Sequence, residues 1–270
     1  MKKIIILLVA LNVFSAFAKD KGRTSFGKEY HVSVNGNDGN DGSLNKPLKT
    51  IMAAANKAMP GDIITVHAGI YRETVIPPRG GESATKRITY QAAKGEKVII
   101  TGAEPVTGWI KEQNDAWKTV IPNTFFGSYN PFGDLIKGDW FSAVGGHIAH
   151  TGSVYLDDQW LKEANALDEV VKPIAGEALF FAEVGSVDTV VHAQFPRKDP
   201  NKSQVEVNVR QTVFYPSKNF INYITVRGFI LQNAAPNWAP PTVEQTAIIG
   251  ANWSKGWIIE NNLQIKNNHK

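Results

Sequence analysis

Short runs of apolar, β-branched residues separated by glycine and charged residues recur along the first hundred positions. Residues 30–34 alternate apolar and polar side chains, and residues 63–66, 88–90 and 98–100 are apolar runs of three or four residues. Such runs, bounded by turn-forming residues, predict short strands. Between the first two, Ile51–Met59 places its apolar residues on one face at helical spacing and is followed by Pro60 and Gly61. This segment therefore predicts a short helix.

A similar rhythm returns near the end of the chain. Residues 223–226, 228–233 and 257–262 are short apolar strands, two of which end in asparagine. Asparagine tolerates the left-handed conformation and can hydrogen-bond a neighbouring turn of chain. The pattern predicts coils of a parallel β-helix with the Ile51–Met59 helix as a cap, although a mixed β-sandwich would explain the same strands.

The middle of the chain, residues 103–220, has a different pattern. Apolar and polar residues alternate more regularly, with strands expected at 153–156, 180–184, 190–195 and 205–209. Asp157 and Asp158 occupy a turn position. Alternation with tight turns is typical of antiparallel sheets that have one solvated face. The fold class predicted is all-β, a right-handed parallel β-helix interrupted by an antiparallel β-sandwich-like insert.

The N-terminal segment has the features of a secretory signal peptide. Lys2 and Lys3 precede an apolar run, Ile4–Phe14, and an Ala-x-Ala-like cleavage site ending at Ala18 follows. We expect cleavage after Ala18, a secreted or periplasmic protein, and no membrane association once this segment is removed. The domains predicted are a signal peptide at 1–18, a disordered linker at 19–28, coils at 29–102, the insert at 103–220 and further, incomplete coils at 221–270.

Composition narrows the function classes. The 270 residues include 29 basic and 25 acidic side chains, a formal charge of +4, and 43% are hydrophobic. This balance does not indicate nucleic-acid binding, and the hydrophobic content can form a core. The absence of cysteine excludes disulfides, thiolate metal sites and cysteine nucleophiles. A homo-oligomer is left open.

No cofactor is predicted from the motifs. His147 and His150 lack a third ligand and so do not indicate zinc. The oxygen-rich loop 35–41 does not match the spacing of an EF-hand, so calcium binding is left open. Phosphate-binding glycine loops and the Gly-x-Ser-x-Gly motif are absent.

Carboxylates and loop aromatics are the remaining candidates for chemistry on sugars. Asp139, Glu73 and Glu260 are possible acids or bases, but nothing in the sequence pairs two of them, as glycoside hydrolysis requires. Trp140 and Trp238 lie in glycine- and proline-rich surroundings, where flat rings suit stacking on a sugar.

Several motifs together resemble a known family. The opening from Tyr30 to Glu73 is similar to that of many secreted right-handed parallel β-helix proteins. The motifs at 122–127, 130–131, 138–140, 238–242 and 252–260 resemble glycoside hydrolase family 120, the β-xylosidases. The resemblance extends from residue 30 to about residue 263.

This resemblance implies a fold and an activity. The family is a parallel β-helix interrupted by a β-sandwich region, and it removes xylose from the ends of xylo-oligosaccharides with retention of configuration. It implies that Trp140 lines the sugar pocket. We expect the residues that bind a xylo-oligosaccharide or a related plant glycan to be Asp139, Trp140, Phe126, Asn130 and Trp238.

The resemblance places no catalytic residue in this chain. The family's nucleophile and acid/base lie in coils that follow the match to Ile258–Asn262, so we expect a truncated chain that is inactive by itself. Two alternatives remain: a non-catalytic carbohydrate-binding β-helix protein, or a relative of polysaccharide lyases. Arg72, Arg87 and Arg227 do not form a recognisable lyase set.

Overall fold

The regular secondary structure of the described residues is mostly β-strand, as the sequence predicted. The computed structural model describes residues 27–138, 146–172, 178–240, 242–244 and 246–265. The predicted signal peptide and most of the predicted linker lie outside these ranges. Within them there are two short α-helices, α1 (Ile51–Lys57) and α2 (Leu167–Val171), and three 3-10 helices, η1 (Asn123–Phe126), η2 (Pro131–Gly133) and η4 (Pro200–Lys202).

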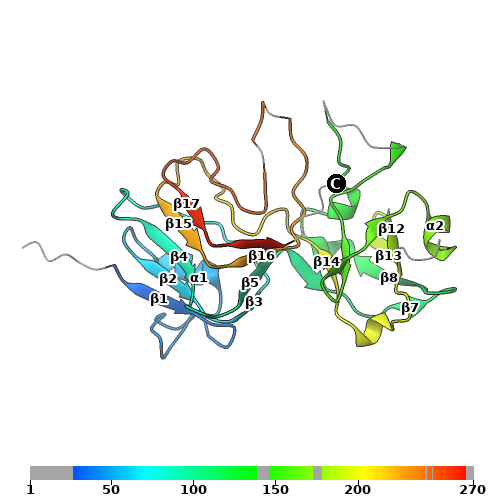
Figure 1. Cartoon of the computed structure of the whole chain (residues 1–270), viewed down its shortest axis with the longest axis horizontal. Helices are drawn as coiled ribbons and strands as arrows, with labels where there is room; N and C mark the ends of the chain where they lie inside the picture. Colours follow the sequence, from blue (N-terminus) through cyan, green and yellow to red (C-terminus); the bar gives the residue numbers. More distant parts are fainter. Residues whose placement is uncertain (1–26, 139–145, 173–177, 241, 245, 266–270) are drawn as a thin grey trace, which may run out of the picture.

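Two sheets are entirely parallel (Figure 1). The first has the order β1 (Glu29–Val32), β2 (Ile63–Val66), β4 (Ile88–Ala92), β15 (Ile224–Arg227) and β17 (Ile258–Glu260). The second contains β3 (Gly69–Tyr71), β5 (Val98–Thr101), β16 (Ile230–Gln232) and β18 (Leu263–Ile265). The chain alternates between them, so that each strand of the first sheet is followed by one of the second, apart from β1.

Equivalent positions of successive strands lie in register. Thr65, Gln91, Arg227 and Glu260 form one outward-facing column of the first sheet. Outside the two parallel sheets, isolated parallel bridges join Val75 to Phe214 and Phe214 to Ile249. They form a third column of aligned residues beside the two sheets. The aliphatic residues that point inward, such as Ile64, Ile88 and Val226, are completely buried in one core cluster.

Helix α1 covers one end of this cluster. Ile51, Ala54 and Ala55 are buried against it. The Thr50 hydroxyl accepts a hydrogen bond from Ala53 N at 3.1 Å and so caps the helix. The helix ends at Lys57, two residues earlier than the sequence predicted, because Ala58 is already extended with ψ of 137°.

The asparagines behave as the pattern predicted. Asn233 and Asn261 have φ of 57° and 54°, the left-handed conformation that turns the chain at the end of a strand. The next residue, Asn262, accepts from Phe229 N at 2.9 Å and donates to Val226 O at 2.9 Å. These bonds join successive windings of the chain.

The insert contains two further sheets, which occupy the right side of Figure 1. One has the order β10 (Gln159–Trp160), β9 (Val154–Leu156), β14 (Val205–Asn208) and β6 (Ala103–Pro105). The other has the order β11 (Lys162–Glu163), β12 (Leu179–Val184), β13 (Asp188–Gln194), β8 (Ala116–Pro122) and β7 (Ile110–Lys111).

All neighbouring strands of the insert are antiparallel except β11 and β12. Side chains of both sheets share one hydrophobic cluster, which includes Val154, Val207, Phe180 and Val191. The β9–β10 turn has φ of 49° at Asp157 and 63° at Asp158, so both aspartates adopt the conformation that a two-residue hairpin requires.

Two segments at the expected domain edges pack with the parallel sheets. Lys28, in the predicted linker, donates its backbone N–H to Asp62 Oδ1 at 2.7 Å. Val213 and Phe214, in the predicted insert, belong to the core cluster of the parallel sheets. The chain therefore leaves the insert before residue 213.

Two arginines form ion pairs where the insert meets the parallel sheets, and the first of them ties the two parts together. Arg72, after β3, donates to Ala103 O at 2.7 Å and pairs with the buried Glu206 of β14 at 2.5 Å. Arg210 pairs with Glu104 of β6 at 2.5 Å. Among the described residues, no helix combines the length and apolar character needed to cross a bilayer.

Candidate functional site

Four residues meet where the insert contacts the segment after β16, and Trp238 directly follows the last of them in sequence. We call the five the junction cluster: Tyr129, Asp134, Thr151, Asn237 and Trp238. The first three belong to insert loops that surround η2, and the last two follow β16. They join parts of the chain that are about a hundred residues apart, which is why no local pattern signalled their association.

Tyr129 is the centre of the cluster. Its hydroxyl lies 2.8 Å from Asp134 Oδ2, 2.6 Å from Thr151 Oγ1 and 2.8 Å from Ala235 O. Burial raises the pKa of this phenol well above its ordinary value, and the Asp134 carboxylate raises it further. Tyr129 therefore stays protonated and acts as a fixed hydrogen-bond donor.

Asp134 uses both carboxylate oxygens. Oδ2 accepts from Tyr129 and from Thr151 Oγ1 at 3.1 Å, and Oδ1 accepts from Asn237 Nδ2 at 2.8 Å. The other side-chain atom of Asn237, Oδ1, is buried and has no hydrogen-bond partner among the described residues. A buried acceptor without a donor is costly, so this atom is suited to receive a hydroxyl group.

Trp238 lies against Gly138. A Cβ atom added at Gly138 would be 2.1 Å from Cζ3 of the indole, so the ring occupies the space that any other side chain would need. Trp238 therefore lies beside the start of the motif Gly138-Asp139-Trp140. Asp139 and Trp140, both expected to contact substrate, lie outside the described residues.

Phe126 and Asn130 lie in the insert framework. Phe126 is 5% exposed in the insert core, where its ring makes an edge contact with Phe132 at 5.8 Å. The Asn130 side chain accepts from Phe132 N at 3.1 Å and donates to Thr189 Oγ1 at 2.8 Å. Both residues shape the loop that carries Tyr129, and Phe126 presents no free face for stacking.

A histidine and a glutamate hold the other side of this loop. Glu163 of β11 accepts from His150 N at 2.8 Å and contacts His150 Nδ1 at 2.6 Å. His150 in turn bridges to Leu135, one residue after Asp134. The segment Leu135–Gly138 is thus fixed from both sides on its way to Asp139.

The other carboxylates considered from sequence are separate from the junction cluster. Glu73 accepts hydrogen bonds from Ile51 N at 2.9 Å and Met52 N at 3.0 Å, and so stabilises the start of α1. Glu260 is exposed, 3.7 Å from Arg227. Over the described part of the chain, no three His, Cys, Asp or Glu side chains are placed to hold a metal ion together.

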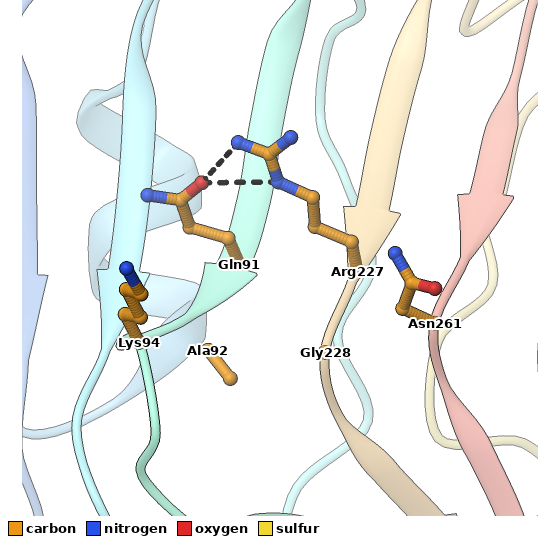
Figure 2. Close-up of a pocket in the computed structure, with 6 residues that line it drawn as sticks. All are labelled: Gln91, Ala92, Lys94, Arg227, Gly228 and Asn261. Atoms are coloured by element: carbon orange, nitrogen blue, oxygen red, sulfur yellow. Dashed lines mark hydrogen bonds between the residues drawn. The ribbon is translucent and has the colours of Figure 1, made fainter.

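A shallow hollow of about 280 Å³ lies where β4, β15 and β17 end (Figure 2). It is lined by Gln91, Ala92, Lys94, Arg227, Gly228 and Asn261. Gln91 Oε1 accepts two hydrogen bonds from Arg227, at 3.1 and 2.6 Å, which occupy that side of the guanidinium group. Of the residues predicted to bind substrate, the three that the structure describes, Phe126, Asn130 and Trp238, do not line this hollow.

The geometry of the junction cluster supports binding. It provides an indole ring and an amide oxygen that has no partner among the described residues, whereas its phenol and its carboxylate are engaged in hydrogen bonds with each other and with their neighbours. Within the described part of the chain, it does not present the two facing carboxylates that glycoside hydrolysis requires.

Comparison with known proteins places this arrangement in a class. Residues 106–180 match the family model described as "Glycoside hydrolase 120, insertion domain", and residues 34–76 match "Protein of unknown function (DUF1565)". The first match covers β7, β8, β9 and the insert loops that carry Tyr129, Asp134 and Thr151. The resemblance to glycoside hydrolase family 120 indicated by the sequence motifs is thereby confirmed.

Two relatives are informative. The structure titled "The complex structure of XylC with xylose" superposes with a TM-score of 0.83 at 42% identity, covering 87% of this chain and 40% of that chain. An "Uncharacterized protein YwoF" from Bacillus subtilis (strain 168) is 34% identical over 97 residues, 35% of this chain and 20% of the relative. The chain therefore spans less than half of either relative.

Proposed function

We propose that this chain forms the N-terminal part of a secreted glycoside hydrolase that acts on β-xylosides and xylo-oligosaccharides. The enzyme would be retaining and would release single xylose units from chain ends. The observation that carries the proposal is the 42% identical structure that was determined with xylose. The insertion-domain match over residues 106–180 supports it.

The fold proposed is a right-handed parallel β-helix interrupted by the insert. The two parallel sheets, which the chain visits alternately, and the third column through Val75, Phe214 and Ile249 support this assignment. In such a fold each coil rests on the next, and side chains at one position of successive coils form a ladder.

In this proposal the junction cluster holds one wall of the sugar pocket. Trp238 packs on Gly138, the residue that precedes Asp139 and Trp140 in sequence. Asn237 Oδ1, which has no partner within the described residues, is suited to accept a sugar hydroxyl. We propose that the two catalytic carboxylates of the enzyme lie in a region that corresponds to the part of the relative that this chain does not span.

A binding experiment tests whether the chain contributes to the sugar pocket. Titration of the chain with xylose and xylobiose, followed by tryptophan fluorescence, should give a saturable change. Trp238→Ala should abolish it, whereas Trp253→Ala should not, because Trp253 is 71% exposed and takes no part in the junction cluster. An unchanged response in Trp238→Ala would remove this residue from the pocket.

An activity assay tests whether the catalytic carboxylates lie outside this chain. The chain by itself should not hydrolyse an aryl β-xyloside above background. A chimera that joins it to the remainder of the xylose-bound relative should do so. If that chimera folds and binds xylobiose but stays inactive, the alternative of a non-catalytic carbohydrate-binding protein is favoured.

Export is tested separately. The segment from Lys2 to Ala18 supports cleavage after Ala18. Mass spectrometry of exported protein should find Lys19 at the N-terminus. Mature protein that retains Met1 would exclude this part of the proposal.

A further inference from the structure

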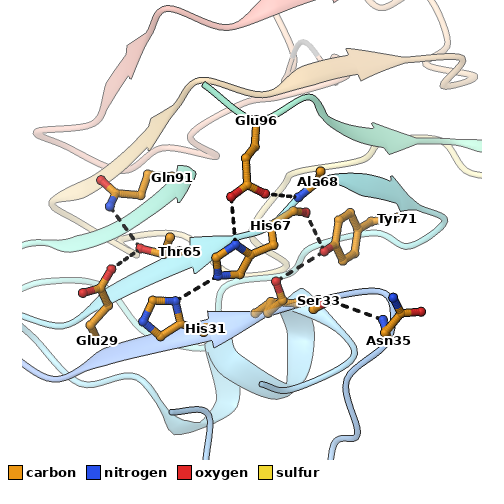
Figure 3. A network of polar contacts seen from close by, with 11 residues as sticks. Glu29, His31, Ser33, Asn35, Thr65, His67, Ala68, Tyr71, Gln91 and Glu96 are labelled. Atoms are coloured by element: carbon orange, nitrogen blue, oxygen red, sulfur yellow. Dashed lines mark hydrogen bonds and ion pairs between the residues drawn. The ribbon is translucent and has the colours of Figure 1, made fainter. Parts of the chain in front are cut away.

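Two histidines that are not part of the junction cluster lie side by side on the outer face of the first parallel sheet. His31 is on β1, and His67 directly follows β2. Nδ1 of His31 is 3.1 Å from Nε2 of His67, and the rings are stacked with centroids 5.3 Å apart and planes inclined by 23° (Figure 3). Both side chains are partly exposed, so a solute can reach them.

A carboxylate fixes the tautomer of His67. Glu96 Oε1 lies 3.1 Å from His67 Nδ1, while Oε2 accepts from Ala68 N at 2.6 Å. A carboxylate is an acceptor, so Nδ1 of His67 carries the proton and Nε2 presents a lone pair toward His31. An imidazole whose other nitrogen donates to a carboxylate has the arrangement that is usual for metal-binding histidines.

The backbone under His67 is also held in place. Its N–H donates to Val32 O at 2.8 Å, and its carbonyl accepts from the Tyr71 hydroxyl at 2.8 Å. The strand that carries His31 is paired in register with β2. The two rings therefore come from a rigid framework, and their separation does not depend on a loose loop.

The separation of the two nitrogens suits a shared metal ion. With nitrogen–metal bonds of about 2.05 Å, a distance of 3.1 Å corresponds to a nitrogen–metal–nitrogen angle of about 98°. That angle lies between the values for square-planar and tetrahedral coordination, the geometries of Cu²⁺ or Ni²⁺ and of Zn²⁺. Binding replaces the hydrogen bond between the rings, and the His31 proton moves from Nδ1 to Nε2.

Nearby charge favours a cation. Glu96 contacts His67, and Glu29 lies two residues before His31 on the same face of β1, where its carboxylate accepts from the Thr65 hydroxyl at 2.5 Å. We propose that His31 and His67 chelate one late first-row divalent metal ion (Cu²⁺, Ni²⁺ or Zn²⁺), with Glu96 as the outer carboxylate and water at the remaining positions.

The test is a calorimetric titration of the metal-free chain with CuCl₂ and ZnCl₂. One equivalent of ion should bind, with Cu²⁺ bound more tightly than Zn²⁺. His31→Gln should weaken this binding at least tenfold, and Glu96→Gln should weaken it by about ten- to a hundredfold with the stoichiometry kept. His150→Gln is the matched control, because His150 also contacts a glutamate but has no histidine in hydrogen-bonding contact in the part of the chain that the structure describes.

Electron paramagnetic resonance of the Cu²⁺ complex provides a readout that does not depend on a variant folding. Two nitrogen ligands in the unaltered chain are expected. No stoichiometric binding, a single nitrogen ligand, equal affinity in His31→Gln, or loss of binding in His150→Gln would each overturn the proposal.

Discussion

At the scale of single residues, the close contact between Gly138 and Trp238 is the most sensitive feature of the candidate site. A Cβ atom at residue 138 would lie 2.1 Å from Cζ3 and 2.5 Å from Cε3 of the indole, which is far inside van der Waals contact. Gly138 has φ of 159°, at the edge of the range that residues with a side chain rarely adopt, so the ring and the dihedral angle both restrict this position.

Gly138→Ala should therefore displace the indole or the chain leading to Asp139. We expect a loss of about 1–3 kcal/mol in the free energy of unfolding, the range typical of overpacking, together with a shift in tryptophan emission. Gly133→Ala is the control, because its added Cβ would be 3.8 Å from the nearest atom of Val184. Urea unfolding measures both, and equal stability of the two variants would contradict the prediction.

The sequence was a better guide to which residues could be important than to which residues contact one another. Trp238 was identified from its proline-rich surroundings, and it does lie beside the Gly138 motif. Phe126 was chosen on similar grounds and is buried in the insert core, because sequence does not show which face of a loop points inward. Tyr129 and Asp134 were missed as functional candidates because their bonds to Ala235 and Asn237 cross 106 and 103 residues.

At the scale of elements, the start of α1 depends on a carboxylate from another part of the chain. Glu73 accepts the backbone N–H groups of Ile51 and Met52, which have no partner within the helix. Burial raises the pKa of Glu73 above its ordinary value, although these two hydrogen bonds act in the opposite direction.

The raised pKa makes a prediction about pH. An acid whose pKa is higher in the folded state binds more protons when folded, so its contribution to stability is complete below the unfolded pKa and declines as pH rises through the folded pKa. The free energy of unfolding of the unaltered chain should therefore fall, relative to Glu73→Gln, as pH rises from about 4.5. Urea titrations across pH 4 to 7.5 measure this difference, and a difference that is constant or rises would refute it.

Strand prediction succeeded where apolar periodicity is strong. Residues 63–66 were expected as a strand and form β2 with the same bounds, and 88–90 is the first part of β4. Strand β8 was not predicted, because the buried residues Ala116, Thr119 and Ile121 do not alternate regularly. Strands β10 and β11 have two residues each, too few to show a period.

At the scale of the whole molecule, the last described strand of each parallel sheet has a neighbour on one side only among the described residues. Strand β17 pairs with β15, and β18 pairs with β16. Ile259 aligns with Val226, which is fully buried, yet Ile259 is 46% exposed, and Leu263 is 55% exposed. An apolar strand edge with free backbone groups readily pairs with another chain.

The purified 270-residue chain should therefore self-associate through this edge. Light scattering should show a mass that rises with protein concentration. Ile259→Lys should return the chain toward a monomer, because a charge that points into the contact must be desolvated when two chains pair. Val187→Lys is the control, since Val187 is 75% exposed in the turn between β12 and β13 and lies outside the parallel sheets. A monodisperse monomer of the unaltered chain, with slow amide exchange at residues 258–260, would show that this edge is already protected.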